Sequence, residues 1–260
     1  MDSTGGAAMG VGSHMDMETA TAVVHRTANE RDLELINLPH IQAVIFVPPE
    51  LPGWLTQFGA AVARGSFQLP RTVLDDVTIS DIERWLDANM PAGAVEPEVL
   101  HAVRDDALSL VAREREMTGA TRFVFRIFTG IPNRHCGFHV DTVPAAAPAH
   151  GLLRVYNGNG TAYVDPDNVI SMREFYKYLS QRERLIRTAE TDSIIELDEA
   201  RPFLLRPDDV HIAPAGSIVA FKHLDVRLHW SEHPRELAWI HCSPMEGDAR
   251  FVVNVMARRS

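Results

Sequence analysis

The chain has 260 residues and a formal charge of −10, with 45% hydrophobic and 23% charged side chains, which is the composition of an ordinary globular protein. The acidic balance argues against a nucleic-acid binder, because such proteins normally carry a basic patch, and no apolar run is long enough to span a membrane. Two cysteines do not make a disulfide framework, and no stretch has the pattern of a secretory signal, so we expect a cytoplasmic protein.

The first residues look foreign to the fold. Residues 1–14 are rich in Gly, Ala and Ser, and Gly12-Ser-His-Met15 is typical of the remnant of a cleavable expression tag. We expect a single domain over residues 15–260, in which residues 15–119 are mainly helical support and residues 120–260 form a β core. Residues 165–207 interrupt this core as an insertion.

The N-terminal part contains one strand pattern and several helix patterns. After a lead-in with little pattern at 17–32, the apolar run at 41–47 predicts a buried strand. Helical spacing of apolar residues predicts helices over 52–64, 80–89 and 97–118. Ser80 with Glu83 predicts a capping box for the second helix, and Gly119 ends the third.

The pattern changes after Gly119 to short runs separated by Gly and Pro turns, which indicates a β fold. Residues 121–129 alternate as a strand. The later runs predict hairpin-like pairs of strands: 152–157 with 161–164, 209–212 with 217–222, and 239–242 with 250–257. In the insertion, Ser171 with Glu174 predicts the start of a helix, which is either a lid over a ligand site or a helix packed on the outer wall.

A possible metal site lies in Cys136-Gly-Phe-His-Val-Asp-Thr-Val143. Side chains two residues apart on a strand leave the same face, so His139 and Asp141 are expected to point into one cavity while Phe138 and Val140 pack on the other side. An imidazole and a carboxylate that converge are two thirds of the 2-His-1-carboxylate triad that holds non-haem Fe(II). Because His-x-Asp also occurs by chance, this hypothesis requires a distant histidine.

His241 is the best candidate for the third ligand, since it lies on a predicted strand in Trp239-Ile-His-Cys-Ser-Pro244. Arg250 follows across a short turn, on the next predicted strand. A guanidinium there can hold a carboxylate through a bidentate pair. By itself Arg250 would be assigned as a surface arginine on an edge strand, but together with His139, Asp141 and His241 it forms a more specific pattern.

This pattern resembles that of the Fe(II)/2-oxoglutarate-dependent oxygenases. The resemblance covers roughly residues 121–257 and implies an α+β protein with a double-stranded β-helix (cupin-like jelly-roll) core and N-terminal supporting helices. It implies that His139, Asp141 and His241 bind the metal and that Arg250 binds the far carboxylate of 2-oxoglutarate. More narrowly, Phe-His-x-Asp, the Gly160-Thr161 turn and His241-Cys-Ser-Pro244 resemble a family of uncharacterised bacterial proteins. Val252 departs from the pattern, because many 2-oxoglutarate enzymes have Ser there.

The implied activity is that of a mononuclear iron dioxygenase that oxidises a small molecule with O₂ and 2-oxoglutarate. Tyr156 is a second candidate for binding the cosubstrate, and Arg126, His135 and Trp239 are candidates for binding the substrate. A salt-bridged strand arginine and a core tyrosine are the alternative assignments for Arg126 and Tyr156.

Two alternative functions stay open. One is an Fe(II) dioxygenase with the same triad that uses no 2-oxoglutarate, in which the substrate itself chelates the iron, as in ring cleavage. The other is a non-enzymatic, cupin-like metal-binding protein in which Cys136 or Cys242 adds a ligand, although both cysteines are also explained as small buried side chains. We expect no nucleic-acid or membrane partner, and the oligomeric state stays open.

Overall fold

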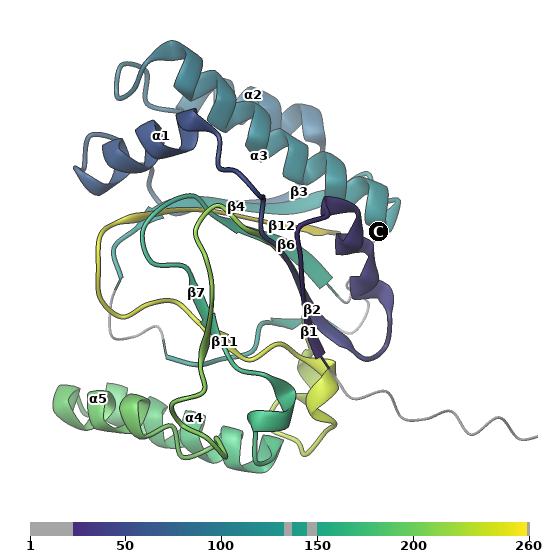
Figure 1. Ribbon diagram of the computed structural model, residues 1–260, viewed down its shortest axis with the longest axis vertical. Helices are drawn as coiled ribbons and strands as arrows, with labels where there is room; N and C mark the ends of the chain where they lie inside the picture. Colours follow the sequence, from purple (N-terminus) through teal and green to yellow (C-terminus); the bar gives the residue numbers. More distant parts are fainter. Residues whose placement is uncertain (1–22, 133–136, 145–149, 259–260) are drawn as a thin grey trace, which may run out of the picture.

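The computed structural model describes residues 23–132, 137–144 and 150–258 (Figure 1). It is an α+β fold whose largest element is a seven-stranded sheet, mostly antiparallel, with the order β1-β2-β9-β6-β12-β4-β3. The strands, in this order, are Val23–Thr27, Ile41–Phe46, Ile218–Lys222, His150–Val155, Arg250–Ala257, Phe123–Gly130 and Thr72–Val77.

Two small sheets lie on one side of this large sheet. One is antiparallel, with the order β11-β7-β8, and the other pairs β10 with β5 in parallel. Their strands, in these orders, are His241–Cys242, Thr161–Tyr163, His211–Ala213, Leu224–Asp225 and Thr142–Val143. Short 3-10 helices connect the elements at Glu30–Asn37, Pro166–Asn168, Val226–Leu228 and Arg235–Leu237.

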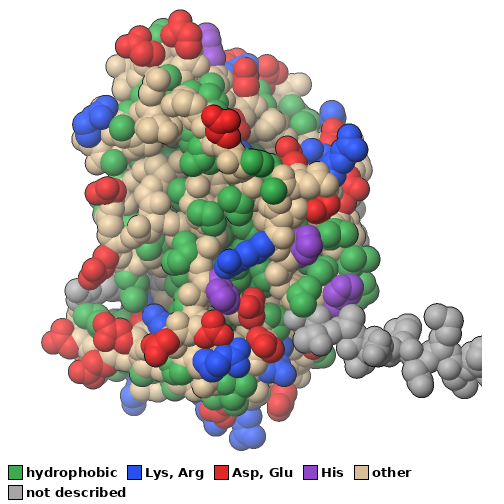
Figure 2. All heavy atoms as spheres, viewed as in Figure 1, with side chains coloured by type: hydrophobic (Ala, Val, Ile, Leu, Met, Phe, Trp, Pro, Cys, Tyr) green, Lys and Arg blue, Asp and Glu red, His purple; other side chains and the backbone are tan. Residues whose placement is uncertain are grey.

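Helices cover the two outer sides of these β layers (Figure 1). The helices over the large sheet are α1 to α3, and those beyond the small sheets are α4 and α5; their bounds, in chain order, are Gly53–Ala63, Ile79–Asn89, Pro97–Thr118, Met172–Arg187 and Thr191–Ala200. On the face drawn in Figure 2, charged side chains of both signs gather at the top and the bottom, over the two helical layers, and more apolar surface lies between them. None of the described helices is long and apolar enough to cross a bilayer.

The large sheet separates two apolar cores, one under α1 to α3 and one toward the small sheets that contains Phe221 and Trp239. Phe125 and Ile127 of β4 point into the core shared with α1 to α3, together with buried side chains from those helices. Arg126 and Phe128 alternate with them and face the small sheets instead, as the period of two along a strand requires. A third core lies between the small sheets and the helices α4 and α5. The alternation predicted for residues 121–129 is therefore confirmed.

The predicted helices are confirmed, but one cap is wrong. The helix α3 begins at Pro97 and ends before Gly119, whose φ of 70° is the left-handed conformation typical of a helix C-terminus. The capping box of α2 is formed by Thr78 and Asp81 rather than by Ser80 and Glu83. Ser80 lies one residue inside the start of the helix, where its hydroxyl does not reach the first free N–H groups.

The predicted hairpins are wrong, although the strands exist. In each pair one strand joins the large sheet and the other joins a small sheet: β6 and β7, β9 and β8, and β12 and β11. Gly160 marks one of these crossings, because a Cβ atom there would lie 1.8 Å from the carbonyl oxygen of Ala213. Glycine permits this close approach of two backbones.

Further segments differ from the sequence expectation, among them residues 72–77, which form the edge strand β3 of the large sheet. The unpatterned lead-in contains β1, an edge strand that pairs in parallel with β2, and the start of the 3-10 helix Glu30–Asn37. Around His139 a regular strand forms only at residues 142–143, and His139 makes an isolated bridge with His241.

In the insertion, Ser171 caps α4 by accepting a hydrogen bond from the backbone N–H of Glu174, as predicted.

Candidate metal centre

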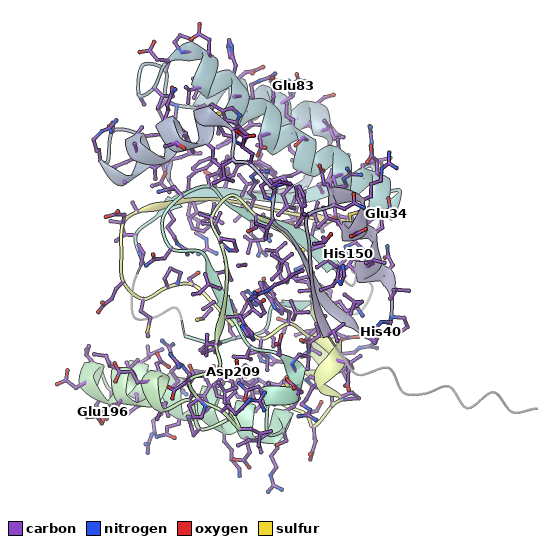
Figure 3. The ribbon with its side chains drawn as sticks, viewed as in Figure 1. Glu34, His40, Glu83, His150, Glu196 and Asp209 are labelled. Atoms are coloured by element: carbon purple, nitrogen blue, oxygen red, sulfur yellow. The ribbon has the colours of Figure 1, made fainter. Side chains whose placement is uncertain are left out.

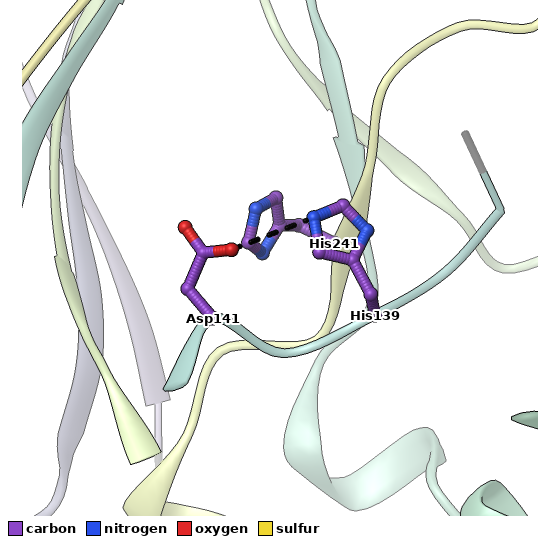
Figure 4. A group of neighbouring side chains, drawn as sticks. All are labelled: His139, Asp141 and His241. Carbon is purple, nitrogen blue, oxygen red and sulfur yellow. Dashed lines mark ion pairs between the residues drawn. The ribbon is translucent and has the colours of Figure 1, made fainter. Parts of the chain in front are cut away.

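Three side chains meet between the β layers (Figure 4). His139 and Asp141 come from the segment before β5, and His241 comes from β11. One ligand atom of each residue lies within 4.8 Å of the others, and Nε2 of His139 is 3.7 Å from Oδ1 of Asp141. These are two nitrogen donors and one oxygen donor on one side of a cavity.

Backbone pairing holds these residues in place. The N–H of His139 donates to the carbonyl oxygen of His241 at 2.8 Å, and the N–H of His241 donates back at 3.0 Å. The N–H of Leu224 donates to the carbonyl oxygen of Asp141 at 2.8 Å. Phe138 and Val140 are buried in the core beside α4 and α5, so the alternation expected around His139 is present without a regular strand.

Hydrogen bonds also define which nitrogen of each histidine is available. Nδ1 of His139 lies 2.9 Å from the carbonyl oxygen of Gly137, and Nδ1 of His241 lies 3.1 Å from that of Trp239. Because a carbonyl oxygen only accepts, each Nδ1 carries the hydrogen, and each Nε2 has a free electron pair. Metal-binding histidines are usually oriented in this way.

The local charges favour the protonation states that a metal requires. Burial and the charge of His139 lower the pKa of His241 to about 4, against the opposing effect of Asp141. Burial raises the pKa of Asp141, but His241 and His139 outweigh it, so the pKa of this carboxyl lies below its usual range. At neutral pH the site therefore offers a neutral imidazole at His241 and an ionised carboxylate at Asp141.

The three side chains open into a cavity of about 440 Å³, which is within the usual range for small-molecule sites. Strands of the large sheet form one wall, and α4 contributes part of the rim. The described lining residues that matter below are Arg71, Arg126, Phe128, Leu153, Val155, Phe221, Arg250, Val252 and Asn254.

Arg250 stands at the start of β12 and is 6% exposed. Its Nη1 donates to the carbonyl oxygen of Asn159 at 3.1 Å, which helps to orient the guanidinium. Gly158, with a φ of +72°, passes close to the side chain: a Cβ atom there would lie 3.1 Å from Cγ of Arg250. The loop between β6 and β7 therefore encloses the stem of this arginine.

The other residues predicted for the site have different positions. Arg126 lines the cavity. Trp239 is fully buried and stacks on His241 with ring centroids 4.4 Å apart and an interplanar angle of 15°, so it supports the imidazole from behind. The structure does not bring Tyr156 to the cavity, because its ring lies in the core on the helical side of the large sheet and its hydroxyl donates to Asp106 at 2.6 Å. His135 and Cys136 lie outside the described residues.

Three residues that the sequence reasoning missed also line the cavity: Arg71, Arg182 and Asn254. Arg182 had a signal, because it follows Leu179 on the otherwise apolar stripe of its helix. Its Nε donates to both oxygens of the buried Asp198, at 2.9 and 3.0 Å. Asn254 had one too, since it shares a strand face with Arg250 and Val252.

Comparisons with known proteins are limited to overall fold. No protein-family model matches the chain, and no curated protein matches it. Among solved structures, a dioxygenase for auxin oxidation from rice is 14% identical, covering 83% of this chain and 73% of that chain with a TM-score of 0.39. A prolyl-4-hydroxylase from Pseudomonas putida is 14% identical, with coverages of 88% and 99% and a TM-score of 0.39. AviO1 from Streptomyces viridochromogenes Tue57 is 12% identical, with coverages of 90% and 97% and a TM-score of 0.39. Similarity at this level assigns no activity to the chain.

Proposed function

We propose that this protein is a mononuclear non-haem Fe(II) oxygenase that uses 2-oxoglutarate, on a double-stranded β-helix core. The observation that carries this proposal is the cluster of His139, Asp141 and His241. Their ligand atoms lie within 4.8 Å of one another, and both Nδ1 atoms are held by backbone carbonyl groups. Two imidazoles and one carboxylate are the donor set of the non-haem iron oxygenases.

The donor set fits an open iron site better than a saturated zinc site. Structural zinc sites are closed by four protein ligands, commonly cysteines. The buried Cys242 follows His241 directly, yet its sulfur is not part of the ligand cluster found among the described residues. Three ligands leave coordination positions for a chelating cosubstrate and for O₂. This arrangement supports an enzyme over a metal-storage or sensor protein.

Arg250 supports 2-oxoglutarate as the cosubstrate. It is the buried arginine at the start of β12, and it lines the same cavity as the three metal ligands. A guanidinium in such a place binds a carboxylate strongly, because charge-assisted pairs gain strength away from water. When bound, iron and 2-oxoglutarate would supply the oxidation of a substrate C–H bond by O₂, with succinate and CO₂ as the products of the cosubstrate.

The chain's own residues then bind, orient and exclude water. His139, Asp141 and His241 hold the metal, and Trp239 keeps the ring of His241 in place by stacking. Phe221, Leu153 and Val155 form an apolar wall of the cavity, which keeps water away from the reacting centre. Arg250 fixes one end of the cosubstrate and so orients the other end toward the metal.

An anaerobic titration with Fe(II), followed by visible absorption with and without 2-oxoglutarate, tests this proposal. We expect a weak charge-transfer band only when both are present. Arg250→Met should weaken 2-oxoglutarate binding at least about tenfold, because a charged hydrogen-bonding partner is lost. Arg258→Met is the matched control, since Arg258 follows the same strand but pairs with Asp75 at the surface, and it should retain the band.

Two results would contradict the proposal. Iron binding without the band in the wild type would mean a triad oxygenase that does not use 2-oxoglutarate. A clear preference for zinc, or no iron binding at all, would remove both oxygenase assignments in favour of a metal-binding protein without this chemistry.

A further inference from the structure

We propose that the substrate is a small organic acid with an apolar body, and that Arg126 and Asn254 bind its carboxylate. This inference rests on the proposed function and names the substrate class of the same cavity. It is carried by the position of these two side chains, by the absence of an ion-pair partner for Arg126 among the described residues, and by the apolar residues around them.

Arg126 and Asn254 are direct neighbours across two strands. Arg126 of β4 is paired in register with Asn254 of β12. Residues directly opposite in an antiparallel pair project on the same face of the sheet, with Cβ atoms roughly 5 Å apart. Both line the cavity, and Asn254 is only 7% exposed. A guanidinium and an amide side by side offer several N–H donors to one carboxylate.

The charge of Arg126 is not used within the described protein. Other arginines near the sheet have acidic partners: Arg154 pairs with Asp106 at 3.1 Å, and Arg182 pairs with Asp198 at 2.9 Å. Arg126 forms no hydrogen bond or ion pair with any residue that the structure describes. Without forming an ion pair, its charge also helps to lower the pKa of Asp141, but Asp141 is already a proposed ligand.

Charge balance leaves Arg126 as the surplus cation of the cavity interior, because Arg71, the other lining arginine without an ion pair to a described residue, is exposed. The two positive charges of Fe(II) would be matched by Asp141 and by one carboxylate of 2-oxoglutarate. Arg250 would match the second carboxylate. A further negative charge is needed to compensate Arg126, because an isolated charge in a partly buried cavity is costly. A singly charged substrate meets this need.

Arg126 and Arg250 project from positions that lie well apart along the sheet, so each side chain can serve a different anion. Arg250 is opposite Gly130 and Asn254 is opposite Arg126 in the register of β12 and β4. The four-residue offset corresponds to about 13 Å along the strand. The cavity therefore has a cationic group near each end of this wall, one for each anion.

The surface between these charges is apolar. Phe128, Val252 and Leu153 line the cavity beside Arg126, and the guanidinium of Arg71 lies 5.2 Å from the centre of the Phe128 ring, at the rim. Such a strip of the wall suits a hydrocarbon or aromatic body, whereas the polar lining residues Thr161, Arg182, Glu183 and Ser243 come from β7, α4 and the segment after β11. The geometry thus favours an acid whose charge is separated from an apolar part.

Ligand-observed NMR with matched pairs of acid and amide tests this inference without turnover. The pairs are phenylacetate and phenylacetamide, benzoate and benzamide, and hexanoate and hexanamide. The protein is loaded with Zn(II), a diamagnetic and redox-inert substitute, and saturated with 2-oxoglutarate so that Arg250 is engaged. At least one acid should bind about tenfold or more tightly than its amide, because hydrogen bonds to charged groups are stronger than neutral ones.

The variants assign that preference to a side chain. Arg126→Met should reduce the difference between acid and amide to about twofold or less, Arg126→Lys should retain part of it, and Asn254→Leu should weaken it. Arg122→Met, which alters a nearby exposed arginine paired with Asp76, should leave it unchanged. Thermal unfolding of each variant confirms that the fold is intact.

Several results would overturn the inference. The first two are that no acid binds, or that each acid and its amide bind with equal affinity. The third is that the preference for the acid persists in Arg126→Met. The fourth is that the preference for the acid disappears with saturating 2-oxoglutarate and depends on Arg250 instead. Repeating the comparison without metal and without 2-oxoglutarate separates this test from the proposed function. If the iron band is absent, an acid preference that depends on Arg126 still supports this inference. If the acid preference is absent, the iron band still supports the proposed function.

Discussion

Glu114 and His150 form a buried ionisable pair away from the proposed metal centre. Oε1 of Glu114, on α3, accepts a hydrogen bond from the N–H of Ala257 at 3.0 Å, and Oε2 lies 3.8 Å from Nδ1 of His150 on β6. His150 is labelled in Figure 3. Burial raises the pKa of Glu114 to about 8, although the Ala257 N–H opposes this shift. Burial, together with the charge of Lys222, lowers the pKa of His150 to about 4. At neutral pH both groups are therefore mainly uncharged.

This pair predicts a pH dependence of stability. Between the unfolded pKa of 4.5 and the folded pKa of about 8, the folded state holds the Glu114 proton while the unfolded state loses it. Stability from this group is thus complete below 4.5 and decreases as the pH rises toward 8. Glu114→Gln has no such proton, so its melting temperature relative to the wild type should increase from pH 5 to pH 8.

Thermal unfolding of both proteins at several pH values measures this difference. The effect of His150 is present in both proteins and largely cancels. A difference in melting temperature that does not change between pH 5 and pH 8 would contradict the raised pKa of Glu114.

At the same scale, part of the candidate site follows from the sequence. The spacing of His139 and Asp141, a distant His241 and then Arg250 led to residues that the structure places around one cavity. That they bind iron and 2-oxoglutarate stays a prediction. Tyr156 was assigned to the site because it lies on a predicted strand near it, but a shift of one residue decides which face of the sheet such a side chain takes. Its partner Asp106 lies on α3, far away in the chain, and no local pattern reveals that pairing.

At the scale of elements, the cap of α2 is formed by the hydroxyl of Thr78 and not by that of the neighbouring Ser80. Oγ1 of Thr78 accepts a hydrogen bond from the N–H of Asp81, and the Asp81 carboxylate accepts one from the N–H of Thr78. Thr78→Ala should therefore lower the free energy of unfolding by about 1 kcal/mol. Ser80→Ala, inside the same helix, should change it by less than about 0.5 kcal/mol. Urea unfolding of both variants gives the values, and an equal cost would show that Thr78 is not the cap.

The helix α4 also anchors the segment that carries His139. The hydroxyl of Tyr178 accepts a hydrogen bond from the N–H of Phe138 at 3.2 Å and donates to Asp198 at 2.6 Å. Tyr178→Phe removes both bonds, so we expect the affinity for Fe(II) to fall about tenfold or more, as for other groups that orient metal ligands.

Tyr176→Phe is the matched control on the same helix. Its hydroxyl contacts His233 instead of the ligand segment, so this change should leave the affinity for Fe(II) within about threefold, the usual scatter of such contributions. Anaerobic calorimetry with Fe(II) measures both variants. Equal effects of the two substitutions would contradict a role for Tyr178 in positioning His139.

Helices were more predictable than strand pairing. The ends of α3 follow from Pro97 and Gly119, because proline suits a first turn and glycine suits the left-handed residue after the last turn. The cap was assigned to Ser80 because Ser80 with Glu83 matches the capping-box pattern, but Thr78 with Asp81 stands beside it, and only backbone geometry separates the two. The predicted hairpins failed because alternation locates a strand without naming its partner.

At the scale of the whole molecule, the two β layers carry different residues of the candidate site. The small sheets and the segments beside them carry His139, Asp141 and His241, while the large sheet carries Arg126, Arg250 and Asn254. The chain passes repeatedly from one layer to the other, as at Gly160. Strands that look like hairpins in the sequence therefore place the proposed metal ligands and the arginines on opposite walls of one cavity. We propose that the cosubstrate binds between these walls.

The most direct test of that claim is the conversion of 2-oxoglutarate to succinate by the Fe(II)-loaded protein in the presence of O₂. We predict succinate formation with matching O₂ consumption in the wild type, and a loss of at least about a hundredfold in Asp141→Asn, because the carboxylate ligand becomes a neutral amide. Arg258→Met should behave as the wild type. Succinate formation by an iron-loaded wild type that is no faster than that of Asp141→Asn would contradict the account.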